Sequence, residues 1–262
     1  MSFLKGKTAL VTGSTSGIGL GIATELARQG ANVLMNGFGD VNAPRQQIAA
    51  ASAALGGRVE YHGADMSKPA EIEAMFKFAA EKFDGIDILI NNAGIQFVAN
   101  IEDFPPEKWD AIIAINLSSA FHTTRLALPC MRRKNWGRII NIASTHGLVA
   151  SVGKVAYIAA KHGLVGLTKT VALETATTGI TVNAICPGWA LTPMVQKQIE
   201  DRAAREKISV EQANHELLQE KEPSLRFSTI EELGGLAVFF CTPAADNVRG
   251  VAWAHDGGWT AQ

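Results

Sequence analysis

The chain has 262 residues, 47% of them hydrophobic and 19% charged, which is enough apolar material for one sizeable core without disulfides or structural metals. Its 24 basic and 25 acidic residues are interspersed and give a formal net charge of -1, a pattern that excludes a typical nucleic-acid or membrane-surface binder. Cys130, Cys186 and Cys241 are too few and too scattered for a disulfide framework, and none has metal-ligand spacing with histidine. We therefore expect a reducing compartment, no metal, and partners that are small molecules or further copies of the chain.

The start of the chain bears on its location. A strand-like segment begins at Thr8, which leaves no room for the apolar core of a signal peptide. No apolar run approaches the ~18 residues of a membrane span. The chain is therefore predicted to be cytoplasmic. Because no linker, charge block or repeat divides the sequence, residues 1–262 are predicted to form a single domain.

Short apolar runs alternate with amphipathic, helix-favouring segments along the whole chain. The runs predicted as strands are residues 8–11, 32–35, 59–61, 86–90, 137–142, 181–185 and 250–254. Strands that alternate with helices form parallel sheets, and right-handed crossovers place the helices on both sides. The sequence therefore predicts an α/β fold: a doubly wound, Rossmann-type parallel sheet of seven strands with helices on both faces.

Some helix ends carry their own signals. Gly30 is predicted to close the first helix, and Ser67 with Pro69 is predicted to open the helix after the third strand. Before the helix that ends near residue 241, Ser228 and Glu231 have the spacing of a capping box.

Residues 12–19 read TGSTSGIG and lie between the first strand and the first helix, which is the context of a phosphate-binding glycine loop. Glycines let the backbone approach a pyrophosphate, whose charge is then met by amide groups at the helix N-terminus. The alternative is an ordinary strand-to-helix turn. The context favours a dinucleotide cofactor.

The end of the second strand bears on which dinucleotide binds. Many sites have an acidic residue there that binds the ribose hydroxyls, whereas residues 36–40 read NGFGD, so the carboxylate is missing or displaced. NADP needs a cation for its 2′-phosphate. Ser16 occupies one position where an arginine could serve, and no Lys or Arg follows the strand before Arg45. We therefore expect NAD.

Two further segments follow strand ends on the expected adenosine side. Asp65, after the third strand, is placed to accept a hydrogen bond from the adenine amino group, and residues 91–94 (NNAG), after the fourth, are placed to wall the adenosine. Each alone is more often a turn or cap residue. Their common position at carboxyl strand ends, where open α/β sheets bind ligands, favours the binding role.

Tyr157 and Lys161 are four residues apart, so on a helix their side chains point the same way. A tyrosine hydroxyl, with an unperturbed pKa of about 10, is a poor base at neutral pH, but a nearby ammonium favours its phenolate. Tyr157 can then take the proton of a substrate alcohol while a hydride leaves to a nicotinamide. The spacing also occurs by chance. It gains weight because Ser144 ends the fifth strand and Asn116 lies in a helix-like segment otherwise made of core positions.

Together TGSTSGIG, NNAG, Asn116, Ser144, the YIAAK segment and the NAICPG segment resemble the short-chain dehydrogenase/reductase family over the whole chain. The resemblance implies Tyr157 as general acid/base, Lys161 lowering its pKa and holding the nicotinamide ribose, Ser144 bonding the reacting oxygen, and Asn116 supporting a water-linked proton relay. It also implies a homotetramer. The positions expected to bind NAD are Gly13, Thr15, Ser16, Gly17, Ile18, Gly19, Phe38, Asp65, Met66, Asn92, Gly94, Tyr157, Lys161, Pro187, Gly188 and Thr192.

The fold hosts many substrates, so the substrate must be argued from the pocket. Polar residues placed to reach it are Gln96, His146, Lys154 and Gln198. One cation, one imidazole and two amides suit a small carboxylate in an otherwise apolar cleft. Trp189 and Trp259 are candidates for its apolar walls. Taken singly, each has an ordinary explanation as a surface or structural residue.

As a set these residues resemble a narrower subgroup, the bacterial D-3-hydroxybutyrate dehydrogenases, in the segments NAGIQ, RIINIASTHGL, GKVAYIAAKHG, NAICPGWALTP, VQKQI and DGGW. The resemblance implies reversible oxidation of (R)-3-hydroxybutyrate to acetoacetate. Its implied carboxylate ligands are Gln96, His146, Lys154 and Gln198, with Ser144 and Tyr157 at the hydroxyl. Phe97 stands where relatives often have histidine and is expected to reduce the polarity of the pocket.

Residues 190–223 break the rhythm of the sheet. This segment is long, charged and helix-favouring, and it lies between the sixth and seventh strands. We expect a lid that closes over the substrate and excludes water. The alternative is a solvated pair of surface helices.

Two other functions remain open. A 3-oxoacyl-thioester reductase of the same family would favour NADPH, against which the missing arginine in the glycine loop argues. A sensor that binds NAD without chemistry would commonly lack the tyrosine or the lysine, and here both are present.

Overall fold

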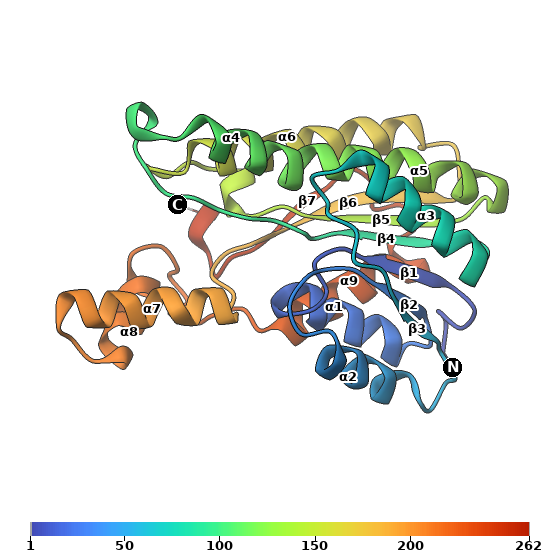
Figure 1. The fold of residues 1–262 in the computed structure, drawn as a ribbon, viewed down its shortest axis with the longest axis horizontal. Helices are drawn as coiled ribbons and strands as arrows, with labels where there is room; N and C mark the ends of the chain where they lie inside the picture. Colours follow the sequence, from blue (N-terminus) through green and yellow to red (C-terminus); the bar gives the residue numbers. More distant parts are fainter. Residues whose placement is uncertain (1, 262) are drawn as a thin grey trace.

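The computed structural model describes residues 2–261 and is built on one seven-stranded parallel sheet (Figure 1). Its spatial order is β3-β2-β1-β4-β5-β6-β7. The strands are β1 Thr8–Val11, β2 Asn32–Met35, β3 Val59–Tyr61, β4 Ile88–Asn91, β5 Gly137–Ile142, β6 Ile180–Pro187 and β7 Ala252–His255. The order reverses between β1 and β4, and this reversal leaves a crevice at the carboxyl ends of the strands. The predicted fold class is confirmed.

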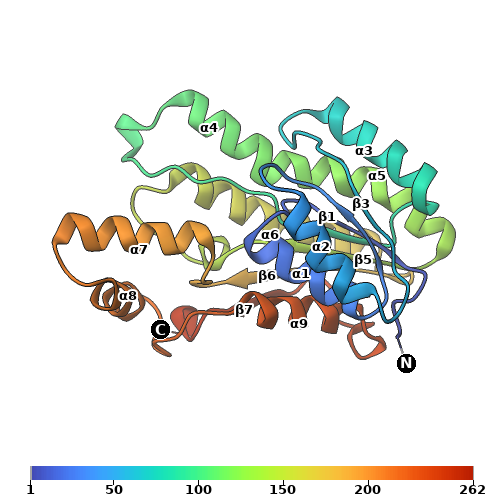
Figure 2. The ribbon, with the colours of Figure 1, turned by 60° about the horizontal axis from the view of Figure 1, so that its bottom comes forward.

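Helices cover both faces of the sheet, as Figures 1 and 2 show. They are α1 Gly17–Arg28, α2 Asn42–Ser52, α3 Pro69–Phe83, α4 Pro106–Ile113, α5 Ser119–Lys134, α6 Val155–Glu174, α7 Pro193–Glu206, α8 Val210–Gln219 and α9 Ile230–Cys241. Successive strand residues point to opposite faces. Within β1, Ala9 and Val11 therefore pack in the core under α1 and α9, whereas Leu10 packs in the core under α3 and α5.

Three predicted strands differ from the structure at their ends. β4 begins at Ile88 rather than residue 86; just before it, the Thr8 amide donates to the Asp87 carboxylate at 3.0 Å and not to a backbone carbonyl of β4. β7 begins at Ala252 rather than 250, because Gly250 has φ +72° and bends the chain, and it ends at His255 rather than 254. β6 is longer than predicted and reaches Pro187.

Of the three helix-end signals, one stands as predicted, one is shifted by a residue and one is wrong. Gly30, at φ +89°, follows the end of α1 as predicted. The capping box before α9 is formed by Thr229 and Glu232, one residue later than predicted. Ser67 does not cap α3, since both its amide and its hydroxyl donate to Asp65.

Helices α7 and α8 follow β6 and project beyond the sheet (Figures 1 and 2). Their base is closed by backbone bonds: Leu191 donates to the Ser228 carbonyl at 3.2 Å, and Ser228 donates to the Trp189 carbonyl at 2.9 Å. The segment predicted as a lid is thus a helical hairpin whose two ends meet. Within the described residues, no helix has both the length and the apolar content needed to cross a membrane.

Candidate active site

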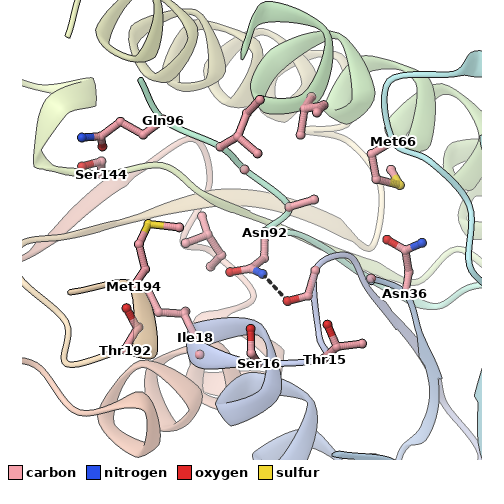
Figure 3. A pocket seen from close by; sticks show the side chains of 18 of the residues that line it. Thr15, Ser16, Ile18, Asn36, Met66, Asn92, Gln96, Ser144, Thr192 and Met194 are labelled. Atoms are coloured by element: carbon pink, nitrogen blue, oxygen red, sulfur yellow. Dashed lines mark hydrogen bonds between the residues drawn. The ribbon is translucent and has the colours of Figure 1, made fainter. Parts of the chain in front are cut away.

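A cleft of about 390 Å³ opens at the carboxyl ends of β1, β2, β4, β5 and β6. Every residue predicted to bind the dinucleotide lines it except Gly19. Figure 3 places Gln96 and Ser144 at one end of this cleft, Asn36 and Met66 at the other, and Asn92 between them. The elongated arrangement fits a ligand with two separate ends.

The glycine loop is locked against the end of β4. The side-chain amide of Asn92 donates to the carbonyl oxygens of Thr12 and Gly13 at 2.8 and 3.1 Å. Gly13 has φ +65°, a conformation that disfavours other residues. A Cβ at Gly19 would collide with the Gly13 carbonyl and the Asn92 amide, so Gly19 serves close packing rather than the cleft surface. The loop thereby brings the N-terminus of α1, a ready anion site, to the cleft.

The far end of the cleft carries an aromatic ring and a carboxylate. The side chain of Phe38 is 65% exposed at the rim. Hydrogen bonds from Ser67 lower the pKa of Asp65, so this carboxylate is ionised at neutral pH. Arg45, the first cation after β2, is paired with Glu60 at 3.3 Å. The cleft residues in the segment between β2 and α2 include no cation.

Ser144, Tyr157 and Lys161 line the other end of the cleft together. Burial raises the pKa of Tyr157, and its hydrogen bond with Ser144 opposes this only in part. Lys161 is 4% exposed, and burial lowers its pKa to about 8. Its ammonium donates to the carbonyl of Ile142 at 2.7 Å. In this arrangement burial, not Lys161, dominates the pKa of Tyr157, and the role expected for Lys161 stays a prediction.

Asn116 is not part of the cleft surface. It lies in a π-helical turn, Ala114–Ser118, between α4 and α5, and its side chain makes two hydrogen bonds with the backbone of Ile95, each 2.9 Å. Single π-turns inside helices are frequent at functional sites. Because Ile95 lines the cleft, Asn116 fixes the strand-end segment that borders the predicted chemistry.

A second cavity of about 160 Å³ adjoins the first, and both are lined by Ser144 and Tyr157. All the predicted substrate residues line it, namely Gln96, Ser144, His146, Lys154, Tyr157, Trp189, Gln198 and Trp259. The imidazole of His146 lies 3.0 Å from the Ser151 hydroxyl. Burial and the nearby cations lower the pKa of His146 to about 4, so it is neutral at pH 7.

The comparisons with known proteins agree with this geometry. The family model for short chain dehydrogenases matches residues 7–203. The chain belongs to the short-chain dehydrogenase family.

Two bacterial relatives and one solved structure are similar to this dehydrogenase over nearly its whole length. It is 68% identical to D-beta-hydroxybutyrate dehydrogenase of Cupriavidus necator over 259 residues, which cover 99% of this chain and all of that protein. It is 55% identical to D-beta-hydroxybutyrate dehydrogenase of Rhizobium meliloti, with 98% and 99% covered. Among solved structures, actinorhodin polyketide ketoreductase with NADPH has a TM-score of 0.88 at 34% identity, with 98% of each chain covered.

The sequence analysis missed a cation that lies over one of the aromatic walls of the second cavity. Trp189 and Trp259 stack with ring centroids 6.5 Å apart at 27°. Lys154 lies over Trp189 at 5.5 Å, and Lys221 lies over Trp259 at 5.8 Å. Lys221 follows α8 in a polar, charged segment, so no local pattern distinguishes it from a solvated lysine.

Other parts of the cavity wall were also missed. Met194 and Val195, in the first turn of α7, line it beside Gln198. The prediction for Phe97 is wrong: its ring packs edge-on against Phe104 at 5.5 Å, in a small separate core of the dehydrogenase.

Proposed function

We propose that this enzyme catalyses the reversible, NAD-dependent oxidation of (R)-3-hydroxybutyrate to acetoacetate. The observation that carries the proposal is the second cavity, which gathers a cation, an imidazole and two amides beside Tyr157. A small carboxylate bound there would lie close to the acid/base residue. The names of the two bacterial relatives support the same substrate.

The first cleft suits a nicotinamide dinucleotide. The N-terminus of α1 and the loop residues Gly13 to Ile18 would hold the pyrophosphate, while Asp65 and Met66 would meet the adenine. Tyr157, Lys161, Pro187, Gly188 and Thr192 would surround the nicotinamide end. The pairing of Arg45 with Glu60 supports NAD over NADP. When bound, the nicotinamide supplies the hydride acceptor.

The protein's part in the chemistry is proton transfer and positioning. Ser144 would bond the reacting oxygen, and Tyr157 would accept the hydroxyl proton of the substrate. For Tyr157 to act as a base, the Lys161 ammonium must stabilise the phenolate, which requires it to share or leave its bond to Ile142. A fixed, buried cation is effective there because the cleft has a low dielectric.

The substrate carboxylate would be held by the charge of Lys154 and by hydrogen bonds from Gln96, Gln198 and neutral His146. Burial lowers the pKa of Lys154, which raises the benefit of an anionic partner. Gln198 and Met194 come from α7, so closure of the helical hairpin α7–α8 would complete the site and exclude water.

We also propose a homotetramer, a cytoplasmic location and a single domain over residues 1–262. The three cysteines are free of disulfides, as suits a reducing compartment. The molar mass in solution, measured by light scattering, tests the tetramer.

The decisive experiment is the initial rate of NADH formation with (R)-3-hydroxybutyrate, its S enantiomer and a neutral ester of the same acid. Activity confined to the free R acid is expected. A faster ester would contradict the carboxylate pocket. Faster turnover of a 3-oxoacyl thioester with NADPH would favour the reductase alternative, and NAD binding without any turnover would favour a sensor.

A further inference from the structure

Glu222 is a buried carboxylate that the proposed chemistry does not use. It lies in the turn after α8, where the helical hairpin α7–α8 returns to the body of the protein, and it is 1% exposed. Its Oε1 accepts a hydrogen bond from the backbone amide of Trp189, while its Oε2 has no partner among the described residues. A buried carboxylate with one partner is costly, so its retention needs a reason.

The carboxylate is wedged between two other chain segments. A Cβ at Gly188 would collide with Oε1 and lie 2.9 Å from the Cα of Asp256, and a Cβ at Gly257 would lie 3.2 Å from Oε2. Gly188 thus needs the small volume of glycine to accommodate this side chain, whereas at Gly257 the nearer obstacle is the Ser224 hydroxyl, and Oε2 is a close neighbour. The end of the hairpin, the segment after β6 and the turn after β7 therefore meet at Glu222.

These two segments carry the stacked indoles of the substrate cavity. Trp189 directly follows Gly188, and Trp259 follows Gly257 by two residues. A backbone bond from Ser224 to the Gly257 carbonyl, 3.0 Å long, ties the same turn to the second segment. Glu222 therefore lies where the two segments that carry the rings approach each other.

We propose that Glu222 is a positioning residue that sets the spacing of Trp189 and Trp259 and so the shape of the substrate cavity. The inference rests on the proposed function for its catalytic readout. It predicts that replacing Glu222 lowers the affinity for the acid and not the affinity for the dinucleotide, since the dinucleotide cleft does not include Glu222.

The ionisation of Glu222 gives a second test of the proposal, the dependence of the KM on pH. Burial, aided by the nearby Asp256 carboxylate, raises its pKa to about 7, while the Trp189 amide and Arg226 oppose this increase. The groups that face it are thus Asp256 from the C-terminal turn and Arg226 from its own turn. Above pH 7 the ionised carboxylate holds the Trp189 amide more strongly, so the KM for the acid should fall between pH 6 and 8.

The test compares Glu222→Leu, which removes the acceptor, with Glu222→Gln, which keeps an oxygen for the Trp189 amide but cannot ionise. Glu220→Leu is the matched control, because Glu220 lies two residues away, is exposed and pairs only with Arg202. We expect Glu222→Leu to raise the KM for (R)-3-hydroxybutyrate at pH 8 by about tenfold or more, with NADH affinity within about twofold of wild type. Glu222→Gln should show, from pH 6 to 8, the KM that the wild type has at pH 6, and so lose the change near pH 7.

Hydrogen exchange of the peptide that contains Trp189 supplies a readout independent of substrate: faster exchange is expected in Glu222→Leu and not in Glu222→Gln. An unchanged KM and unchanged exchange in Glu222→Leu would overturn the inference. So would equal losses of acid and NADH affinity, which indicate a general structural role. If Glu222→Leu does not fold, a wild-type pH profile in Glu222→Gln overturns it. A wild-type enzyme that fails to oxidise the R acid contradicts the proposed function alone, and the exchange experiment still decides the role of Glu222.

Discussion

The ammonium of Lys161 donates a 2.7 Å hydrogen bond to the carbonyl oxygen of Ile142, at the end of β5, and lies 5.5 Å from the ring centroid of Tyr157. This buried cation is therefore held by one backbone group. That one bond offsets only part of the cost of burying the charge, and the role proposed for Lys161 in the reaction explains why it is kept, a trade common at active sites.

Replacing Lys161 by Met should therefore stabilise the fold while abolishing turnover. Burial lowers the pKa of Lys161 from 10.5 to about 8, so between these values the folded chain binds fewer protons than the unfolded chain. Wild-type stability should consequently rise as the pH increases through this window. We expect Lys161→Met to gain roughly 1–3 kcal/mol in urea unfolding at pH 7. This gain should shrink towards pH 10, and a loss of stability at pH 7 would contradict the account.

Tyr157→Phe deletes the ionisable proton but little volume. We expect kcat to fall by roughly 10²–10⁴-fold, the usual contribution of a positioned acid/base. The Kd for NADH, measured by fluorescence titration, should change little because the ring remains in place. Substantial residual turnover would remove Tyr157 from the proton transfer.

Lys154→Ala removes the cation over Trp189. A buried substrate carboxylate would lose a charged partner worth roughly 2–4 kcal/mol, so the KM for the acid should rise strongly while the Kd for NADH stays constant. Lys169→Ala, an exposed change farther along α6, serves as the control. An unchanged KM in Lys154→Ala would place the carboxylate elsewhere.

Gly19→Ala tests the packing of the glycine loop. Its Cβ would collide with Gly13 and Asn92, so the loop must shift, and we expect weaker NADH binding together with a stability loss of roughly 1–3 kcal/mol. Gly166→Ala, where a Cβ meets open space on α6, should instead be neutral or slightly stabilising. Equal behaviour of the two variants would show that close packing at Gly19 is unimportant.

The sequence predicted the parts of the fold whose physics is local. Continuous apolar runs identify buried parallel strands, and their carboxyl ends locate the residues that gather in the cleft. The shift of the capping box, by contrast, has a tertiary cause: Ser228 and Thr229 are adjacent, and the Ser228 hydroxyl is diverted to the His255 imidazole, 2.8 Å away. Only the tertiary contact distinguishes the two positions.

The rest of the candidate site depends on long-range packing. Lys221 lies over Trp259 only because the hairpin folds back after α8, and Phe97 leaves the pocket because Phe104 offers it an apolar neighbour. The roles of Asn116 and Glu222 likewise depend on backbone groups that are distant along the chain, at Ile95 and Trp189. Spacing rules cannot find such partners, because each arises from where separate elements meet.

The stacked pair of Trp189 and Trp259 also gives the second cavity its own fluorescence signal. One indole lies just before the helical hairpin and the other near the C-terminus, with a lysine over each ring. Emission from such a pair depends on ring separation and on the nearby charges. Movement of the hairpin can therefore be followed in the unlabelled protein, by stopped-flow fluorescence on mixing with the acid.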